Sequence, residues 1–401
     1  MKIDEISAHQ LLSEAQALFP YTQELRRDFH RHPELGFKEK RTAGIVAREL
    51  RSLDLEVRTE IAETGVVGLI EGTLPGPVVM LRFDMDALPI QEETGAFYQS
   101  QVPGCMHACG HDGHIAIGLT VARLLKARRS SLQGTVMLVF QPAEEGLGGA
   151  ERMIADGVLN GPRPDVAFGF HLWNEKPLGW IGATPGPAMA AGDIFKIAVT
   201  GRGGHGAQPH LAADPVLASS QVVSLLQSIV ARNLSPLESG VLSVTMIHGG
   251  EAFNIIPARV EMAGTIRTFD ERVRERVIRR LEEILHGTVE ALGCKAELEI
   301  TALTPAVVND PQSVLRVQSL ARQLFPEYTI QGDFQVVVSE DMAHFLNRVP
   351  GCFVFIGSAN AEKALDAHHH NPKFDFDEKA LPVASALAAA AALSCLTQPG
   401  S

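Results

Sequence analysis

The chain has 401 residues, 45% of them hydrophobic, and a formal net charge of −12. This length is enough to bury a complete core and predicts two domains. The excess of acidic residues argues against nucleic acid or an anionic membrane surface as a partner. The sequence contains no apolar run long enough to cross a membrane. Composition leaves the nature of a small-molecule ligand open, because a local site can oppose the overall charge.

The N-terminus and the cysteines indicate the cellular compartment. The stretch "MKIDEISAHQLL" is polar and lacks the charged-then-apolar layout of a secretory signal, so we expect a cytoplasmic location. The five cysteines are scattered and odd in number, which does not favour a disulfide framework. Cys294 and Cys352 lie in apolar contexts typical of core residues, whereas Cys109 lies among histidines.

The first half of the chain alternates helix and strand patterns. Residues 8–53 have helical periodicity, and two strand-like runs follow at 66–72 and 77–89. Residues 114–129 repeat apolar residues on one face and end in basic residues, which predicts a helix. The apolar run 134–146 predicts a buried strand, as does the run "VAFGFHLW". This alternation predicts a mixed, mostly parallel α/β sheet flanked by helices.

A different pattern begins at about residue 190. The expected order is strand, helix, strand, strand, helix, strand, at residues 194–203, 214–233, 240–250, 258–269, 270–293 and 295–303. This order is typical of a split βαβ, ferredoxin-like unit. The α/β pattern resumes near Pro305. We therefore predict a catalytic domain in two segments, 1–189 and 303–401, and an inserted α+β domain at 190–302.

Clusters of ionisable residues lie at or just past the ends of predicted strands in the outer domain. In an open α/β sheet, ligands bind at the edge where the strands end. A further cluster follows the strand "CFVFIG" by a loop. The clusters are Asp84 with Asp86, Cys109 with His111, Glu144 with Glu145, His171, and His368 to His370.

Thiolate, imidazole and carboxylate together suit a divalent ion such as zinc, manganese, cobalt or nickel. A buried anion at Cys109 or Glu145 would be unfavourable without a cation beside it. A bound metal would also depress the pKa of the Cys109 thiol and keep it a thiolate. Five candidate ligands are too many for one tetrahedral ion with an open position. They suit two ions that share a bridging ligand and a water molecule.

The adjacent Glu144 and Glu145 cannot both do one job. Their side chains point to opposite faces if the strand continues through them, but both reach the site if the strand has frayed. A natural division places one on metal and leaves the other to take a proton from water, which is typical of carbonyl hydrolysis. Each cluster alone has an ordinary interpretation: His171 as a core histidine, Cys109 as an inert thiol. Their shared edge favours the functional interpretation.

The inserted domain carries three further candidates. His205 lies in the glycine-rich loop "TGRGGHGAQPH", which permits close approach to a ligand or is a plain surface loop. This loop lacks the spacing of a dinucleotide site. Asn254 and Arg267 taken singly resemble ordinary polar groups on strands.

Taken together, these motifs resemble peptidase family M20 in its amidohydrolase branch. That branch includes hippurate hydrolase, N-acyl-amino-acid aminoacylases, N-acetyl-diaminopimelate deacetylase and plant auxin-conjugate hydrolases. The resemblance covers nearly the whole chain. It rests on "RRDFHRHPELGFKEKRTA", "LRFDMDALPI", "MHACGHDGH", "FQPAEEGLGGAERMI", "FGFHLW", "GRGGHGAQPHLAADPV", "FNIIPARVEMAGTIRTFD", "SEDMAHFL" and "HHHNPKFDFDEKALP".

The resemblance implies a role for each outer-domain candidate. Cys109 matches a thiolate that bridges two metals, and the implied further ligands are His111, Glu145, His171 and His370. His370 is preferred to His369 because the family histidine directly precedes an x-Pro-x-Phe segment. Glu144 matches the general base and acid. Asp86 matches a supporting aspartate, while Asp84 stands where peptidases of the wider family have a histidine, which leaves its role open.

The resemblance also implies an activity and an assembly. It implies two divalent ions per subunit (manganese, zinc, cobalt or nickel) and hydrolysis of an N-acyl amino acid, for example acetyl or benzoyl. The inserted domain matches a lid or dimerisation domain, so we expect a homodimer or homotetramer. His205 matches a histidine that stabilises the oxyanion, and in many family members this histidine reaches the active site of the partner subunit. Asn254 and Arg267 match substrate-binding residues. The alternatives are a dipeptidase or carboxypeptidase using the same site, and a metal-bound protein without catalysis.

Overall fold

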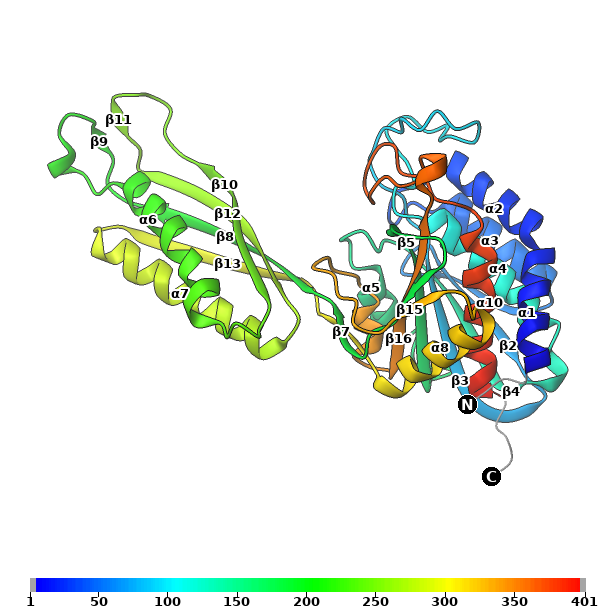
Figure 1. Ribbon diagram of the computed structural model, residues 1–401. Helices are drawn as coiled ribbons and strands as arrows, with labels where there is room; N and C mark the ends of the chain where they lie inside the picture. The colour runs from blue at the N-terminus through cyan, green and yellow to red at the C-terminus, as the bar shows by residue number, and fades with distance from the viewer. Residues whose placement is uncertain (1–4, 397–401) are drawn as a thin grey trace. The chain divides into compact units, whose positions relative to one another are not determined.

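The structure is a computed structural model that describes residues 5–396. The chain divides into two compact units (Figure 1). The smaller unit contains residues 189–307 and 336–340, and the larger unit contains the rest of the chain. None of the helices within the described range is both long and apolar enough to cross a bilayer.

An eight-stranded mixed sheet forms the centre of the larger unit. In spatial order its strands are β1 (Glu56–Ile61), β2 (Gly65–Glu71), β4 (Gln133–Gln141), β3 (Leu74–Asp84), β5 (Val166–Pro177), β16 (Gly351–Ala359), β6 (Trp180–Gly182) and β15 (Thr329–Gln331). The central pairs β3–β4, β3–β5 and β5–β16 are parallel, as is β6–β15, and the remaining neighbours are antiparallel. The predicted mixed sheet with a parallel centre is confirmed.

Helices cover both faces of this sheet. β2 and β16 are buried along nearly their whole length, as expected for strands that are covered on both sides. α4 and α10 pack against the sheet, and α1 and α2 pack against those two helices. α5 (Gly149–Ala155) lies on the other side of the sheet, against β4 and α9 (Ala343–Leu346) (Figure 1). The helices on the side of α4 and α10 are α1 (Glu5–Ala17), α2 (Phe19–Arg31), α3 (Lys40–Ser52), α4 (His111–Lys126), α8 (Pro311–Leu324) and α10 (Ala380–Leu396).

Helix α4 approaches the sheet unusually closely, and a glycine makes this possible. A Cβ atom at Gly118 would lie 2.7 Å from both the Phe83 and the Phe140 ring. Nearly every residue of α4 is buried, so this helix forms part of the core. The close packing places the first turn of α4 beside the end of β3, where His114 contacts Asp84.

The smaller unit is an antiparallel four-stranded sheet with α6 (Pro215–Ser228) and α7 (Glu271–Ala291) packed on one face. Its strands, in spatial order, are β10 (Gly240–His248), β12 (Arg259–Thr268), β8 (Ala191–Thr200) and β13 (Lys295–Thr304). A two-stranded ribbon of β9 (Gly204–His205) and β11 (Ile255–Ile256) accompanies it. The β-α-β-β-α-β order along the chain confirms the predicted ferredoxin-like class. The short strands β7 (Gly186–Met189) and β14 (Val307–Asn309) lie where the chain passes between the units.

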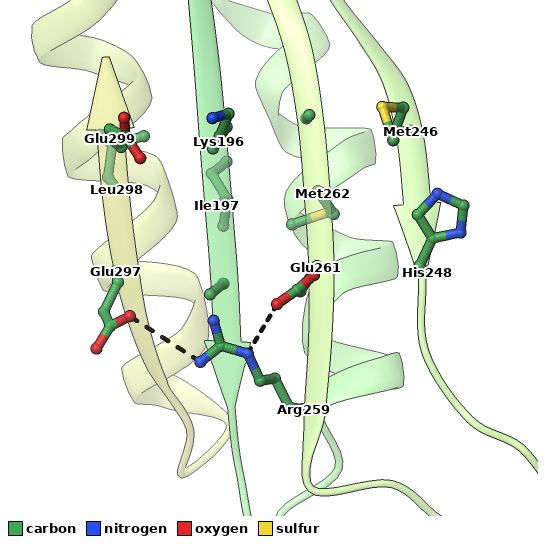
Figure 2. Close-up of a pocket in the computed structure, with 12 residues that line it drawn as sticks. Lys196, Ile197, Met246, His248, Arg259, Glu261, Met262, Glu297, Leu298 and Glu299 are labelled. Atoms are coloured by element: carbon green, nitrogen blue, oxygen red, sulfur yellow. Dashed lines mark hydrogen bonds and ion pairs between the residues drawn. The ribbon is translucent and has the colours of Figure 1, made fainter. Parts of the chain in front are cut away.

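The second face of this small sheet, opposite α6 and α7, carries charged side chains. Figure 2 shows Arg259 between two glutamates: it donates to Glu261 at 3.1 Å and lies 4.0 Å from Glu297. The opposite-facing residues Ile197 and Met262 are buried under the helices. The hollow on this open face contains none of the residues that the sequence singles out for chemistry.

Candidate metal centre

Strands β3 and β4 position four carboxylates of the candidate site. Asp84 is the last residue of β3, Asp86 follows it closely, and both are buried. β4 ends at Gln141, before the two glutamates. Because the strand has ended, Glu144 and Glu145 both reach the site, and each offers an oxygen within 4.8 Å of His111. The arrangement with the two side chains on opposite faces is therefore excluded.

Cys109 and His111 do not follow a strand, so their predicted place just past a strand end is wrong. In residues 85–110, all of which the structure describes, the strand-like pairing is limited to bridges that Ala87 and Leu88 make. Gly110, with a φ of 85°, turns the chain into α4, whose first residue is His111. A left-handed glycine turn, rather than a strand end, positions the two side chains.

His171 lies within β5, not at its end, so this part of the prediction is also wrong. β5 continues to Pro177, but it pairs with β3 only as far as Gly169. His171 therefore lies beyond the last residue of β5 that β3 covers. The histidines 368–370 lie in the loop after β16, as expected.

The candidate ligands converge on Cys109. Its Sγ lies 3.5 Å from His171 Nε2, and the ligand atoms of Cys109, His111 and His171 lie within 4.8 Å of one another. Cys109 forms a second such group with Glu145 and His370, in which His370 Nε2 lies 3.2 Å from Glu145 Oε1. A sulfur common to two ligand groups is the arrangement that two bridged ions require.

Two potential metal-binding atoms of the site are buried and make no hydrogen bond within residues 5–396. They are His111 Nε2 and Glu145 Oε1, which lie 4.0 Å apart. Buried polar atoms almost always have partners, so an exception needs an explanation. A divalent cation that accepts nitrogen, sulfur and oxygen ligands would satisfy both atoms. The residues present therefore fit a metal centre.

Hydrogen bonds to carbonyl oxygens fix which nitrogen of each histidine can bind a metal. His111 donates from Nδ1 to the Asp86 carbonyl at 2.9 Å, and His171 donates from Nδ1 to the Leu172 carbonyl at 2.7 Å. Since a carbonyl only accepts, Nδ1 carries a proton and Nε2 is the nitrogen that can face a metal. His171 Nε2 lies 3.5 Å from the Cys109 sulfur, and His111 shares that ligand group. This is the outer hydrogen bonding typical of metal-binding histidines.

The electrostatics of the site favour a cation. Burial raises the pKa of the Cys109 thiol well above its usual range, and Glu145, Glu144 and Asp84 raise it further. Burial lowers the pKa of His111, but Asp84, Asp86 and Glu145 outweigh it and raise this pKa to about 10. Both shifts report an excess of negative charge. A divalent ion would offset that charge and turn the thiol into a thiolate.

Asp84 and His114 form a further candidate ligand group with His111, but their other contacts favour a supporting role. Its Oδ1 accepts a hydrogen bond from His114 Nδ1 at 2.6 Å, and its Oδ2 accepts one from Arg82 at 2.6 Å. His114 Nε2 in turn accepts the Leu172 N–H at 2.9 Å. Both nitrogens of His114 are thus engaged with the protein, so this histidine is not placed as a ligand. Asp84 lies 3.7 Å from His111 Nε2, behind the ligand set.

Asp86 contacts one residue of each ligand group that contains Cys109. Its carbonyl accepts from His111 Nδ1, and its Oδ2 accepts the Glu145 N–H at 3.0 Å. One residue therefore orients a histidine through its backbone and a glutamate through its carboxylate.

The adjacent histidines of the C-terminal loop have separate environments. His370 has a φ of 63° and faces Glu145, and its N–H donates to the Ala108 carbonyl at 2.8 Å. His369 turns the other way: its Nε2 donates to the Leu172 carbonyl at 3.0 Å and its ring packs near Trp173. The geometry favours His370 over His369 as a ligand.

Glu144 shares a candidate ligand group with His111 and Glu145, next to the two groups that contain Cys109. Its Oε1 accepts the Asp341 N–H at 3.3 Å, and its carbonyl accepts the Gly146 N–H at 2.6 Å. The side chain is partly exposed. A carboxylate held beside a metal site and open to solvent is suited to proton transfer.

The structure separates the three candidates of the smaller unit. His205 and Asn254 are exposed neighbours, since β9 pairs with β11 and Gly206 donates to the Asn254 carbonyl at 2.8 Å. Arg267 lies near the other end of β12, eight residues beyond Arg259. At ~3.4 Å per residue this is about 27 Å along the strand. His205 and Asn254 therefore form one group, and Arg267 does not belong to it.

A buried arginine that the sequence motifs did not single out lies beneath the site. Arg82, which is 1% exposed, bridges Asp84 and Asp341, to which it donates at 2.9 Å. The Asp341 carboxylate also accepts from Gln141 and from the Ala150 N–H, while its own N–H contacts Glu144. A charged residue inside the apolar strand "PVVMLRFD" was the available signal, because an arginine there needs buried partners.

Comparison with known proteins adds independent evidence. Residues 80–394 match the profile of peptidase family M20/M25/M40. The chain is 40% identical to N-acetylcysteine deacetylase of Bacillus subtilis, over 90% of this chain and 93% of the relative. It is 40% identical to thermostable carboxypeptidase 1 of Saccharolobus solfataricus, over 89% of this chain and 91% of that protein.

A solved structure shares the fold. The Bacillus subtilis YXEP protein, described as a dinuclear metal binding peptidase from the M20 family, superposes with a TM-score of 0.83. The two chains are 36% identical, and the match covers 95% of this chain and 99% of that one. The profile match spans well over half of the chain, and the relatives are similar along nearly their whole length. The resemblance seen in the motifs is thus confirmed: this chain belongs to peptidase family M20/M25/M40.

Proposed function

We propose that this protein is a metal-dependent amidohydrolase that cleaves N-acyl amino acids to a carboxylic acid and a free amino acid. The observation that carries the proposal is the pair of ligand groups that share Cys109, with the Glu144 carboxylate beside them. A hydrolase for amide bonds is also what family membership and the deacetylase relative support.

Two divalent ions would be held by the candidate ligands that converge on the sulfur, which are Cys109, His111, Glu145, His171 and His370. Manganese, zinc, cobalt and nickel all suit this mixture of donors. Bound ions of this kind acidify a water molecule and polarise a carbonyl oxygen.

The chain's own residues handle the protons and the oxyanion. Glu144 takes the proton of the attacking water and later protonates the leaving amine, a role for which its partly exposed carboxylate beside the ligand groups is suited. Asp86 is a positioning residue that holds His111 and Glu145. His205 stabilises the tetrahedral oxyanion, worth about 3–4 kcal/mol if it acts like other oxyanion donors. Asn254 and Arg267 bind the substrate.

The active form is a homodimer or a homotetramer built from dimers. His205 pairs with Ile255, just before the Arg259 end of β12, whereas Arg267 lies about 27 Å along that strand from Arg259, so an acyl amino acid cannot touch both in one chain. A second subunit that supplies His205 and Asn254 resolves this conflict. The strand β10 supports such pairing: it is an edge strand without charged side chains, and Met246 and Ile247 on it are half exposed.

The most informative experiment is a product-detected screen of N-acyl amino acids, with acetyl and benzoyl groups, on protein loaded separately with manganese and zinc. We expect release of a free amino acid with at least one metal. A dipeptidase or carboxypeptidase is the alternative, and the carboxypeptidase relative favours testing it. Dipeptides in the same screen distinguish the two. Protein that binds N-acyl amino acids and never hydrolyses them would contradict both.

We further propose a cytoplasmic location. The five cysteines are all free, which suits a reducing compartment. Fractionation of the cells that make the protein tests this, and recovery of the protein outside the cytoplasm would contradict it.

A further inference from the structure

The segment 34–39, "ELGFKE", lies between two loops that carry site residues. At its start, the Glu34 carbonyl accepts the Ala87 N–H at 2.9 Å, and Leu35 forms a parallel bridge with Ala87. Ala87 directly follows Asp86. The Glu34 carboxylate caps the next helix, because it accepts the N–H groups of Arg41 and Thr42. One end of the segment is therefore fixed both to α3 and to the loop of Asp86.

The other end of the segment carries a fully buried carboxylate. Glu39 is 0% exposed. Its Oε1 accepts the Ala143 N–H at 2.9 Å, and its Oε2 accepts the Thr64 hydroxyl at 2.6 Å. Each carboxylate oxygen thus has one donor, and one of the two donors belongs to the residue directly before Glu144. Burial of an acid without hydrogen-bond partners is strongly unfavourable, so these two hydrogen bonds explain how Glu39 can be buried.

The turn that Glu39 contacts adopts a conformation that needs support. Ala143 has a φ of 55°, in the left-handed region that side chains other than glycine rarely adopt. Such residues persist only where the surroundings hold them, and they cluster at active sites. Gly36 packs directly against this turn: a Cβ atom there would lie 3.0 Å from Ala143 Cβ and 2.6 Å from Leu147. Segment 34–39 therefore touches the turn at two points.

Two carboxylates from separate elements hold the glutamate turn by its backbone. Asp86 accepts the Glu145 N–H, and Glu39 accepts the Ala143 N–H. The two N–H groups flank Glu144. Fixing both fixes the direction in which the Glu144 and Glu145 side chains leave the backbone.

We propose that Glu39 is a positioning residue, which holds the left-handed turn at Ala143 so that Glu144 is aimed at the water and Glu145 at the metal. This inference rests on the proposed function for the roles of the two glutamates. Glu39 itself touches neither the metal ligands nor the substrate. Its effect passes through the Ala143 N–H.

The test compares Glu39→Ala with Glu39→Gln. The glutamine keeps an oxygen for the Ala143 N–H and offers its amide to the Thr64 hydroxyl, which can accept as well as donate. We expect Glu39→Ala to bind manganese or zinc about 10- to 100-fold more weakly by calorimetry. We expect its kcat at saturating metal to fall on the order of 10²-fold with KM changed less than about twofold. Glu39→Gln should stay within about threefold of the parent protein in both measurements.

Two further variants separate positioning from general stability. Thr64→Val removes the other hydrogen bond of Glu39 and leaves the Ala143 bond, so its metal affinity should change less than about threefold. Gly36→Ala leaves Glu39 intact but pushes on the turn, so it should show the same paired loss as Glu39→Ala. If Glu39→Ala does not fold, Gly36→Ala decides the question.

Three results would overturn the proposal. The first is a folded Glu39→Ala protein with unchanged metal affinity and unchanged kcat. The second is a Glu39→Gln protein as impaired as Glu39→Ala, which would show that charge and not the hydrogen bond matters. The third is a Gly36→Ala protein that loses stability alone. The calorimetric arm needs no substrate, so it remains decisive even if the screen of N-acyl amino acids finds no hydrolysis.

Discussion

His114 donates its Nδ1 proton to Asp84 across 2.6 Å, and both side chains are buried. The same aspartate accepts a hydrogen bond from Arg82, so two donors compensate its charge. Asp84 stands where a metal-binding histidine occurs in the wider family, yet here it supports a histidine that is itself engaged at both nitrogens. We therefore expect Asp84 to support the ligand set rather than to bind metal.

We expect Asp84→Asn to keep two ions at saturating metal and to lose stability. The amide would place a donor against the donor of His114 or Arg82, and breaking a buried charged contact costs about 3–5 kcal/mol. Metal counting by mass spectrometry and denaturant unfolding measure the two effects. Asp165→Asn is the control, because its carboxylate also accepts a hydrogen bond, from the Val78 N–H, but lies before the start of β5 rather than at the end of β3. Loss of one ion at saturating metal would instead make Asp84 a ligand.

The two adjacent glutamates should separate metal binding from turnover. We expect Glu144→Gln to keep both ions and to lose turnover by about 10²–10⁴-fold, the range for a general base. Glu145→Gln should lose metal affinity, because Glu145 and not Glu144 shares a ligand group with Cys109 and His370. Metal titration and kcat on both proteins check this. A Glu144→Gln protein with two ions and full turnover would contradict the assignment.

The two adjacent histidines provide a matched pair for the C-terminal ligand. His370→Ala should release metal, since this ring faces Glu145. His369→Ala should keep two ions, since its ring bonds to the Leu172 carbonyl and packs against Trp173 and Phe374. We expect the His369→Ala protein to lose stability, because the aromatic packing of this ring is removed. The opposite pattern of metal retention would assign the ligand to His369.

Glu39 should make stability depend on pH. Burial and the nearby Asp86 raise its pKa from 4.5 to about 7, although the bonds from Thr64 and Ala143 lower it. Between these two pH values the folded state binds more protons than the unfolded state, so the free energy of unfolding falls as pH rises from 4.5 to 7. Glu39→Gln should remove this decline, on the order of 3 kcal/mol by pH 8.

Urea unfolding of both metal-free proteins across this pH range measures the decline. Parallel pH curves for the parent protein and Glu39→Gln would contradict the prediction. Using metal-free protein keeps the pH dependence of metal binding out of the comparison.

Mixed dimers should show whether His205 serves the other subunit. His205→Ala and Glu144→Gln should each be nearly inactive alone. In a dimer of one chain of each kind, the site of the His205→Ala subunit receives an intact His205 from its partner. An equal mixture, after subunit exchange, should therefore regain about a quarter of the parent activity. No recovery, with exchange verified by mass spectrometry, would place His205 in its own subunit's site.

Local sequence patterns predicted the secondary structure and the main chemical groups well. The strand-helix order of both units follows from hydrophobic periodicity, and the convergence of Cys109, His111, His171 and Glu145 was expected from the fold. The local structure that positions two of these residues differs from the prediction. His111 begins a helix after a glycine turn, and His171 lies within a strand. Periodicity does not reveal a left-handed turn at a single glycine.

The supporting residues could not be predicted from local patterns. Arg82 pairs with Asp341, which is 259 positions away, and Glu39 pairs with Ala143, 104 positions away. Such contacts depend on how distant segments pack, and a single sequence carries no direct record of them. The choice between His369 and His370 likewise depends on backbone angles in a loop.

The insertion of one unit into the other has a consequence for biosynthesis. The smaller unit is almost contiguous, at 189–307, whereas β16 and His370 come late in the chain. On the ribosome, the inserted unit emerges whole while the large sheet still lacks its β16 neighbour, and domains generally fold as they appear. The candidate ligand group of Cys109, Glu145 and His370 can therefore form only after residue 370 has left the exit tunnel.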